Sequence, residues 1–218
     1  MSESETNADP LDADRLKVLG AALDEAAFSG FTRETLQAAA REAELPEGDL
    51  AILFPRGVAD LLDFWSSTTD AEALARFEAA GGAEMRIRDK VTSAVRCRLE
   101  VLEPHREAAR RAGATLALPQ HAGLAPRLAW RTADAIWRAC GDTATDFNHY
   151  SKRTILSGVY LSTFAVWLAD AEGERWPGFL EARIENVMQF EKAKAQAKKI
   201  GFDPAAPWRF LGSLRYGR

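Results

Sequence analysis

The sequence predicts an all-α protein, and three observations support this fold class. Apolar residues recur at three- and four-residue intervals along most of the chain, which is the spacing that gathers them on one face of a helix. Gly, Pro and Thr stand between these stretches, where helices commonly begin and end. The segment 127–170 shows two such patterns joined by a short polar segment, which predicts a helical hairpin.

The first 80 residues predict four helices after a polar start that we expect to be disordered. The apolar pattern of the first helix runs from residue 11 to Gly30. Thr32 is suited to cap a second helix, because its hydroxyl accepts a free backbone N–H bond. A short third helix is expected within 47–55. A long fourth helix is expected within 57–80, before a Gly pair.

The remainder of the chain predicts four more helices, separated by Gly and Pro. Gly141 fits the end of a helix, since it tolerates left-handed dihedral angles. Pro177 fits the first helical position. A bend is expected near Pro104. The pattern of Pro and Gly in residues 116–126 predicts a connection with a short helical turn. The expected helices are 85–112, 128–140, 146 or 147 to 169, and 177 to about 200.

Four arginines lie beside the apolar stripe of the helix expected at 85–112. We expect them to lie on the outer, solvated face and to pair with nearby carboxylates, because Arg is seldom fully buried. A functional anion site is the alternative, for which the sequence offers no further support. They are Arg86, Arg88, Arg96 and Arg98.

The composition is that of an ordinary globular protein, but its charge is unevenly distributed. The chain is 47% hydrophobic and 28% charged, with a formal net charge of −4, which gives no general attraction to nucleic acid. Residues 1–80 hold 17 acidic and 6 basic side chains, whereas residues 190–218 hold 7 basic and 2 acidic ones. One end of the chain is therefore acidic and the other basic.

The cysteines and the N-terminus indicate a reducing compartment. Cys97 and Cys140 show no metal or disulfide spacing, so we expect two buried thiols. The polar, acidic start resembles neither a secretory signal nor an Arg-rich transit peptide. No stretch approaches the roughly 18 apolar residues of a membrane span. We therefore expect a cytoplasmic protein whose membrane contact is peripheral.

The sequence carries no motif of an enzyme. His105, His121 and His149 fall in different elements without partners at metal-ligand spacing, and no Glu-x-x-His pair is present. Dinucleotide, P-loop and nucleophile-elbow motifs are also absent. Asp142 and Asp146 are explained by helix capping more simply than by acid–base catalysis. We expect no catalytic residue, no metal and no cofactor.

The junction of the hairpin is richer in polar groups than a plain connection requires. A turn between two helices needs a cap and a Gly, but seven hydrogen-bonding side chains lie within twelve residues. The aromatic residues of the two flanking helices lie at helical spacing, and the simplest interpretation is that they pack in a core. The junction residues are Asp142, Asp146, Asn148, His149, Tyr150, Lys152 and Arg153.

A specific resemblance begins at this junction. The run Gly141-Asp142-x-x-Thr145-Asp146-x-Asn148-x-Tyr150-Ser151-Lys152-Arg153, with Trp130 and Trp137 upstream and Val159-Tyr160 downstream, resembles the coenzyme Q biosynthesis protein Coq-nine family. The resemblance is strongest over 128–183 and extends more loosely over 16–200. It implies a non-enzymatic helper of ubiquinone biosynthesis with a TetR-like helical fold. Such a helper binds an isoprenoid lipid and presents the quinone precursor to the di-iron hydroxylase of the pathway.

The order of the first four helices also resembles the helix-turn-helix domain of TetR-type regulators. A recognition helix needs cations for phosphates and donors for base edges. The third helix here offers Glu47 and Asp49, with no Lys or Arg before Arg56. We therefore expect a degenerate helix-turn-helix domain that binds no nucleic acid. A TetR-type transcriptional regulator remains the alternative, and a homodimeric scaffold without a ligand is a third.

The resemblance implies a lipid pocket between the helices at 128–140, 146–169 and 177–190, with the polar junction at its mouth. An isoprenoid tail gains about 25 cal/mol per Å² of apolar surface removed from water, so the pocket should be long and apolar. The sequence alone does not separate pocket-lining aromatics from core. The candidate lipid-binding residues are Trp130, Ala133, Trp137, Tyr160, Phe164, Trp167, Leu180 and Ile184.

The resemblance also implies that the surface around the junction receives the hydroxylase. Eukaryotic family members commonly place Trp before the Tyr, whereas this chain has His149. Either His149 supplies a similar flat contact, or the contact is weaker and depends on protonation. The candidate partner-binding residues are Asp134, Trp137, Asp142, Asp146, Asn148, His149, Tyr150 and Arg153.

The basic tail is the last expected feature. Its apolar face suits an interfacial helix on anionic lipid at the inner membrane, although it could also dock on its own domain or on a second subunit. The family fold implies a homodimer. The expected organisation is a disordered start at 1–10, a TetR-like helical region at 11–80, a lipid-binding bundle at 83–200 and an amphipathic tail at 201–218. The candidate membrane residues are Trp208, Phe210, Leu211 and Leu214.

Overall fold

The computed structural model describes residues 10–46, 48–143 and 147–199, and in these ranges all regular secondary structure is helical. The predicted fold class, an all-α TetR-like bundle, is therefore confirmed. The helices are α1 (Pro10–Ser29), α2 (Arg33–Glu42), α3 (Asp49–Leu53), α4 (Val58–Ala79), α5 (Ile87–Leu102), α6 (Arg106–Leu116), α7 (Leu124–Ala139), α8 (Phe147–Ala169) and α9 (Trp176–Lys199), with short 3₁₀ turns η1 (Gly82–Glu84), η2 (Glu103–His105) and η3 (Pro119–His121).

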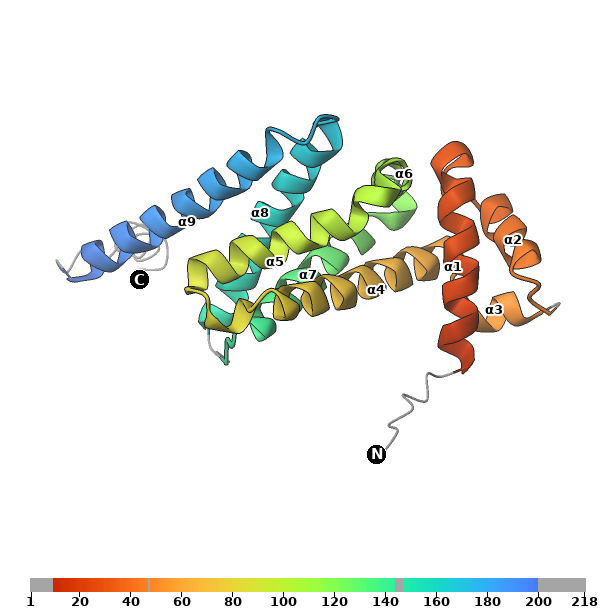
Figure 1. The fold of residues 1–218 in the computed structure, drawn as a ribbon, viewed down its shortest axis with the longest axis horizontal. Coiled ribbons are helices and arrows are strands. Elements are labelled where there is room, and N and C mark those ends of the chain that lie inside the picture. Colours follow the sequence, from red (N-terminus) through yellow and green to blue (C-terminus); the bar gives the residue numbers. More distant parts are fainter. Residues whose placement is uncertain (1–9, 47, 144–146, 200–218) are drawn as a thin grey trace, which may run out of the picture.

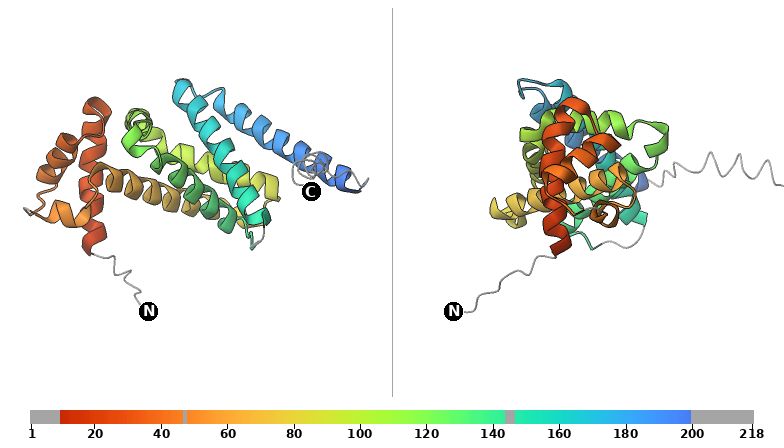
Figure 2. Two further views of the ribbon diagram at one scale, coloured as in Figure 1. Left: turned by 180° about the vertical axis from the view of Figure 1, so that it is seen from behind. Right: turned by 90° about the vertical axis from the view of Figure 1, so that its right-hand side faces the viewer.

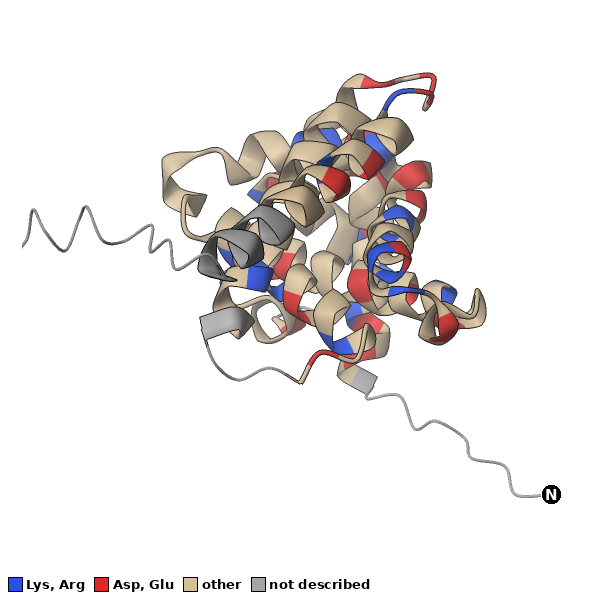
Figure 3. Ribbon diagram, turned by 90° about the vertical axis from the view of Figure 1, so that its left-hand side faces the viewer, with Lys and Arg blue, Asp and Glu red and all other residues tan. Residues whose placement is uncertain are grey.

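The helices form an elongated bundle with the N-terminal helices at one end (Figures 1 and 2). α1 crosses the start of α4 and packs on α2 and α6, while α2 and α3 lie on its outer side. α4, α5 and α7 run along the length of the molecule, with α8 packed on α7. α9 packs on α8 and α5 at the opposite end. Basic and acidic residues are interleaved on the helices when the bundle is viewed from that end (Figure 3).

A continuous apolar core joins the described helices. Each long helix turns its apolar positions inward, as the three- and four-residue spacing predicts. Phe77 of α4, Leu99 of α5, Trp167 of α8 and Leu180 of α9 are completely or almost completely buried. The free thiols of Cys97 and Cys140 are buried too, which confirms that expectation.

Local signals placed most helix ends correctly. Thr32 caps α2, because its hydroxyl accepts a hydrogen bond of 3.1 Å from the backbone N–H of Thr35. Gly30 and Gly141 follow α1 and α7 with φ of 75° and 84°, the left-handed conformation that favours glycine at this position.

Three sequence predictions need correction. The helix expected at 85–112 is two helices, α5 and α6, separated by the turn η2; Pro104 has no N–H to continue the helical ladder. α7 begins at Leu124, so the preceding connection is shorter than expected. Arg88 and Arg96 pair with Glu185 and Glu181 as expected, but Arg98 lies in the core instead of on the outer face.

Candidate functional site

The polar junction between α7 and α8 is organised by the buried guanidinium of Arg153. Its Nε donates to Asp134 Oδ1 at 2.5 Å, and its Nη1 donates to Asp142 Oδ2 and to the His149 carbonyl, each at 3.1 Å. The side chain of Arg153 is only 2% exposed. Arg153 therefore joins α7, the connection and the first turns of α8 from the inside. The guanidinium itself is therefore not exposed at the surface.

Lys152 and Asp142 form the second half of the junction. Lys152 Nζ donates to Asp142 Oδ1 at 2.6 Å and lies 5.2 Å from the centre of the Trp137 ring, a cation–π distance. The indole N–H of Trp137 donates to the Lys152 carbonyl at 3.2 Å. Burial alone would raise the pKa of the Asp142 carboxyl, but hydrogen bonds from Lys152 and Arg153 outweigh it and hold that pKa below its ordinary value. Asp142 thus serves as an ion-pair acceptor in the junction.

An aromatic patch lies on the outside of the junction. The ring of Tyr150 is exposed, and its centre lies 5.2 Å from that of His149 and 6.1 Å from that of Trp130. Trp130 comes from α7, whereas His149 and Tyr150 come from the first turn of α8. We call these three residues the aromatic patch.

A pocket of about 450 Å³ lies between α5, α7, α8 and α9. Most of its wall is aliphatic, and the polar junction contributes Asp142, Ser151 and Lys152 to the lining. Arg88, which also lines it, is paired with Glu185 of α9 at 2.6 Å. The aliphatic wall consists of Ile87, Val91, Ile155, Leu156, Val159, Ile184, Val187 and Met188.

The structure separates the eight candidate lipid-binding residues into four groups. Trp137 and Ile184 line the pocket. Tyr160 and Phe164 line a second, smaller cavity of about 90 Å³ between α4, α5, α6, α7 and α8. Trp130 lies in the aromatic patch. Ala133, Trp167 and Leu180 are buried in the core and line neither cavity.

Trp167 shows why a buried aromatic need not line a pocket. Its indole N–H donates to Glu103 Oε2 at 2.8 Å, and the Arg106 guanidinium lies 4.5 Å from its ring centre. The ring of Phe164 stacks on the indole as well, with the ring centres 5.5 Å apart, and Trp167 is completely buried. Among the aliphatic side chains that line the pocket, the sequence predicted Ile184 and missed the others. The four-residue spacing of Ile87 and Val91 shows that they share a helix face, but it does not show that this face borders a void.

A buried ion pair lies beside the second cavity. Arg98 Nε donates to Asp70 Oδ1 at 2.6 Å, its Nη2 donates to Ser66 Oγ at 3.1 Å, and its Nη1 donates to the Tyr160 hydroxyl. Thr132 Oγ1 donates to the same Asp70 carboxylate at 3.0 Å. Burial alone would lower the pKa of the Arg98 guanidinium, but the interactions with Tyr160 and Asp70 outweigh burial and hold that pKa above its ordinary value. This cluster connects α4, α5, α7 and α8.

Cys140 gives a first test of the pocket geometry. Burial raises the pKa of its thiol to about 11, and the residue lines the pocket. Because the thiolate is the reactive form, we expect iodoacetamide at pH 8 to alkylate Cys140 in the folded protein roughly a hundredfold more slowly than an exposed thiol. Peptide mass mapping before and after unfolding in urea measures this. Rapid labelling of the folded protein would show that the wall at Cys140 is open.

The described residues contain no group of three or more His, Cys, Asp or Glu side chains that is arranged to hold a metal ion. In the same part of the chain, no helix combines the length and the apolar character needed to cross a membrane.

Comparisons with known proteins point to the same region. The COQ9 family model matches residues 122–191. We call these matched residues the COQ9-like domain. This domain contains α7, α8 and most of α9, and therefore the polar junction, the aromatic patch and three walls of the pocket. α5 supplies the fourth wall from outside the COQ9-like domain.

Similarity to COQ9 proteins extends beyond that domain. The chain is 29% identical over 194 residues to the protein of Bos taurus named ubiquinone biosynthesis protein COQ9, mitochondrial. The aligned region covers 85% of this chain and 60% of the bovine protein. It is 28% identical over 203 residues to the Drosophila melanogaster protein of the same name, and the aligned region covers 90% of this chain and 62% of that protein. It is 29% identical over 194 residues to the Homo sapiens protein, with 85% of this chain and 61% of the human protein covered. The chain thus spans about 60% of the length of these COQ9 relatives.

Some candidate residues lie outside the described part of the chain. Asp146 and the tail residues Trp208, Phe210, Leu211 and Leu214 fall in ranges that the structure does not describe, and so does the side chain of Asn148. Their assigned roles in partner and membrane binding remain predictions.

Proposed function

We propose that this chain is a non-enzymatic accessory protein of ubiquinone biosynthesis. It binds an isoprenoid lipid or quinone precursor and presents it to the di-iron demethoxyubiquinone hydroxylase at the membrane. The observation that carries this proposal is the pocket of about 450 Å³ with aliphatic walls, which lies largely within the COQ9-like domain.

The pocket suits a long apolar ligand. Its volume falls within the range of about 300–1,000 Å³ that is common for small-molecule sites. Aliphatic walls favour an isoprenoid chain, because burial of its surface is worth about 25 cal/mol per Å². Ser151 and Lys152 are the lining groups at the junction that can donate to a ligand oxygen. We therefore place the quinone ring toward the junction and the isoprenoid tail along α5 and α9.

The aromatic patch supplies the partner surface in this proposal. Exposed aromatic side chains with polar edges are enriched at protein interfaces, since they bury much area at low conformational cost. The patch lies beside the junction that contributes to the pocket lining, so a hydroxylase bound there would be close to the ligand. Arg153 supports this surface through Asp134, Asp142 and the His149 carbonyl.

Replacing Tyr150 by Ala tests the partner surface. Tyr150 is 60% exposed, so the substitution should leave the fold intact. We expect the affinity for the hydroxylase to fall about tenfold or more, as for a central aromatic contact, while the lipid content stays unchanged. Co-purification and titration of the purified hydroxylase measure this.

The matched control is Phe28→Ala, which removes a second exposed ring, 83% accessible, from α1 at the other end of the bundle. Equal hydroxylase affinity of wild type, Tyr150→Ala and Phe28→Ala would refute the proposed partner surface.

We further propose that the protein works in the cytoplasm, peripherally at the inner membrane, as a homodimer. The basic charge of residues 190–218 supports contact with anionic lipid. The TetR-type regulator is the less favoured function, because α3, the expected recognition helix, carries Asp49 and no Lys or Arg to bind phosphates.

A further inference from the structure

Helix α9 is the outermost of the four helices that form the walls of the pocket. It packs on α8 and α5 at the end of the bundle opposite α1, and its C-terminal part extends past the other helices (Figures 1 and 2). It contributes Ile184, Val187 and Met188 to the aliphatic wall. α9 is therefore the wall that can move without displacing another helix from the core.

The N-terminal end of α9 is firmly anchored. The Asp170 carboxylate accepts hydrogen bonds from the backbone N–H groups of Arg175 and Trp176 at 2.7 and 2.9 Å, and such groups have no acceptor within the helix that they begin. Trp176 and Leu180 follow on the apolar face and are 7% and 0% exposed. A capping carboxylate and buried apolar side chains thus fix this end to the bundle.

The apolar contacts of α9 weaken toward the pocket. Ile184, one turn after Leu180, is still buried, but Val187 and Met188 are only half-buried and Phe190 is 62% exposed. Side chains that border a void lack packing partners on that side and gain less from dispersion contacts. The bundle therefore holds α9 most strongly at its start and least strongly over the pocket.

Two ion pairs join the described side chains of α9 to α5. Arg96 Nη2 lies 3.4 Å from Glu181 Oε1, and Arg88 Nη1 lies 2.6 Å from Glu185 Oε2. All four side chains are between 35% and 58% exposed. Exposed pairs of this kind contribute little to stability and are screened by salt. The pair of Arg88 with Glu185 is the one at the pocket, because Arg88 lines it.

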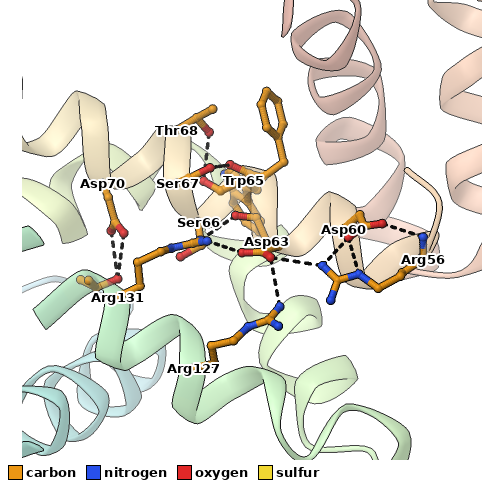
Figure 4. Close-up of polar contacts among 12 residues, drawn as sticks. Arg56, Asp60, Asp63, Trp65, Ser66, Ser67, Thr68, Asp70, Arg127 and Arg131 are labelled. Carbon is orange, nitrogen blue, oxygen red and sulfur yellow. Dashed lines mark hydrogen bonds and ion pairs between the residues drawn. The ribbon is translucent and has the colours of Figure 1, made fainter. Parts of the chain in front are cut away.

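The other three walls of the pocket are held more firmly. α7 is joined to α4 by the Asp63 carboxylate, which accepts from Arg127 Nη2 at 3.0 Å and from Arg131 Nη1 (Figure 4). Arg131 Nη2 also donates to the Asp63 carbonyl at 2.8 Å. The buried guanidinium groups of Arg153 and Arg98 join α8 to α7 and α5 to α4. Among the described ion pairs, those between α9 and α5 are therefore the ones that open at least cost.

We propose that α9 is the lid of the pocket and that the pair of Arg88 with Glu185 is its latch. The helix swings about the anchor at Asp170 and Trp176, which breaks the latch and separates the aliphatic side chains of α9 from those of α5. A long apolar ligand then enters or leaves from the side and does not have to pass lengthwise through the bundle. This inference rests on the proposed function, because it concerns the ligand of the same pocket.

The reactivity of Cys140 measures the opening of the lid. Cys140 lines the pocket, whereas Cys97 is buried in the core and lines neither the pocket nor the second cavity. Movement of α9 therefore exposes Cys140 alone, while global unfolding exposes both thiols. The full chain is treated with iodoacetamide, and peptide mass mapping gives the rate at each cysteine. Phosphatidylcholine vesicles are present to accept any lipid that leaves the pocket.

Glu185→Arg replaces the latch by repulsion from Arg88, and we expect it to raise the labelling rate of Cys140 about fivefold. The double substitution Arg88→Glu with Glu185→Arg restores an ion pair with reversed charges and should return the rate to that of the wild type. The matched control is Glu107→Arg, which breaks exposed ion pairs within α6 and should leave the rate unchanged. The rate at Cys97 should be the same in all four proteins.

Three results would overturn the lid: an unchanged rate at Cys140 in Glu185→Arg, no restoration by the double substitution, or an equal rise at Cys97. The labelling does not depend on which ligand the pocket holds. A rate at Cys140 that depends on the latch, in a protein that carries no isoprenoid lipid, would support the lid and contradict the proposed function.

Discussion

Replacing Arg153 by Ala should lower the free energy of unfolding by about 3–5 kcal/mol. The substitution removes the buried partner of Asp134 and Asp142, whose side chains are only 18% and 6% exposed. Removing one partner of a buried ion pair is costly because it leaves the other charge poorly solvated. For a chain of this size the loss corresponds to a decrease of roughly 10 °C in Tm.

Urea denaturation followed by circular dichroism measures this loss, and Arg138→Ala is the matched control. Arg138 pairs with the same Asp134 at 2.6 Å, but its side chain is 72% exposed. Exposed ion pairs contribute about 0–1 kcal/mol, so the control should hardly change. Similar stability of the two variants would contradict the role of Arg153 as the organiser of the junction.

The effect of Arg153→Ala should also depend on pH in a defined direction. Hydrogen bonds from Lys152 and Arg153, against the effect of burial, hold the pKa of Asp142 below its ordinary value in the folded protein. A carboxyl with a lowered folded pKa contributes stability above its unfolded pKa, about 3.9, and loses it as the pH falls through the folded value. The difference between wild type and variant should therefore be full at neutral pH and should shrink below about pH 4.

Replacing Asp70 by Ala should cost a similar amount, about 3–5 kcal/mol. Arg98 and Asp70 are 5% and 8% exposed, so the guanidinium would stay in the core without its carboxylate. Thr132 would lose its acceptor as well. The free energy of unfolding in urea measures this cost.

Glu72→Ala is the control for Asp70→Ala. It breaks an ion pair on the same helix, with Arg76 at 2.6 Å, in which the carboxylate side chain is 54% exposed. We expect a change of at most about 1 kcal/mol. If Asp70→Ala were as mild as Glu72→Ala, the cluster around Arg98 would not be a stabilising element.

Local sequence patterns predicted the helices, but they could not predict which residues pair with the buried charged side chains. Thr32 and Gly141 mark helix ends through their own chemistry, so the sequence indicates them directly. Arg98 lies in the core because Asp70 and Tyr160, 28 and 62 residues away in the sequence, provide its acceptors. Periodicity within one helix contains no information about such distant partners, and Arg98 was therefore expected on the surface.

The sequence predicted where the candidate site lies but not which side chains form its walls, because local patterns contain no information about contacts between distant segments. Helical spacing shows which residues turn inward, but it does not show whether inward faces meet closely or enclose a void. Trp137 and Trp167 both face inward, yet Trp137 borders the pocket and Trp167 is packed on every side. The density of polar residues did indicate that the junction is more than a turn. Its central ion pair, Arg153 with Asp134, spans 19 residues and appears only in the folded chain.

The proposed function requires that the pocket between α5, α7, α8 and α9 holds an isoprenoid lipid. Val187→Trp places a large ring in the pocket wall, whereas Phe190→Trp changes an exposed position on the same helix. The decisive measurement is native mass spectrometry with lipid extraction of the full chain, purified without harsh detergent, for wild type and both variants. We expect an isoprenoid lipid with wild type and Phe190→Trp, and a severalfold lower amount with folded Val187→Trp. Absence of isoprenoid lipid from the wild type, or equal amounts in all three proteins, would contradict the account.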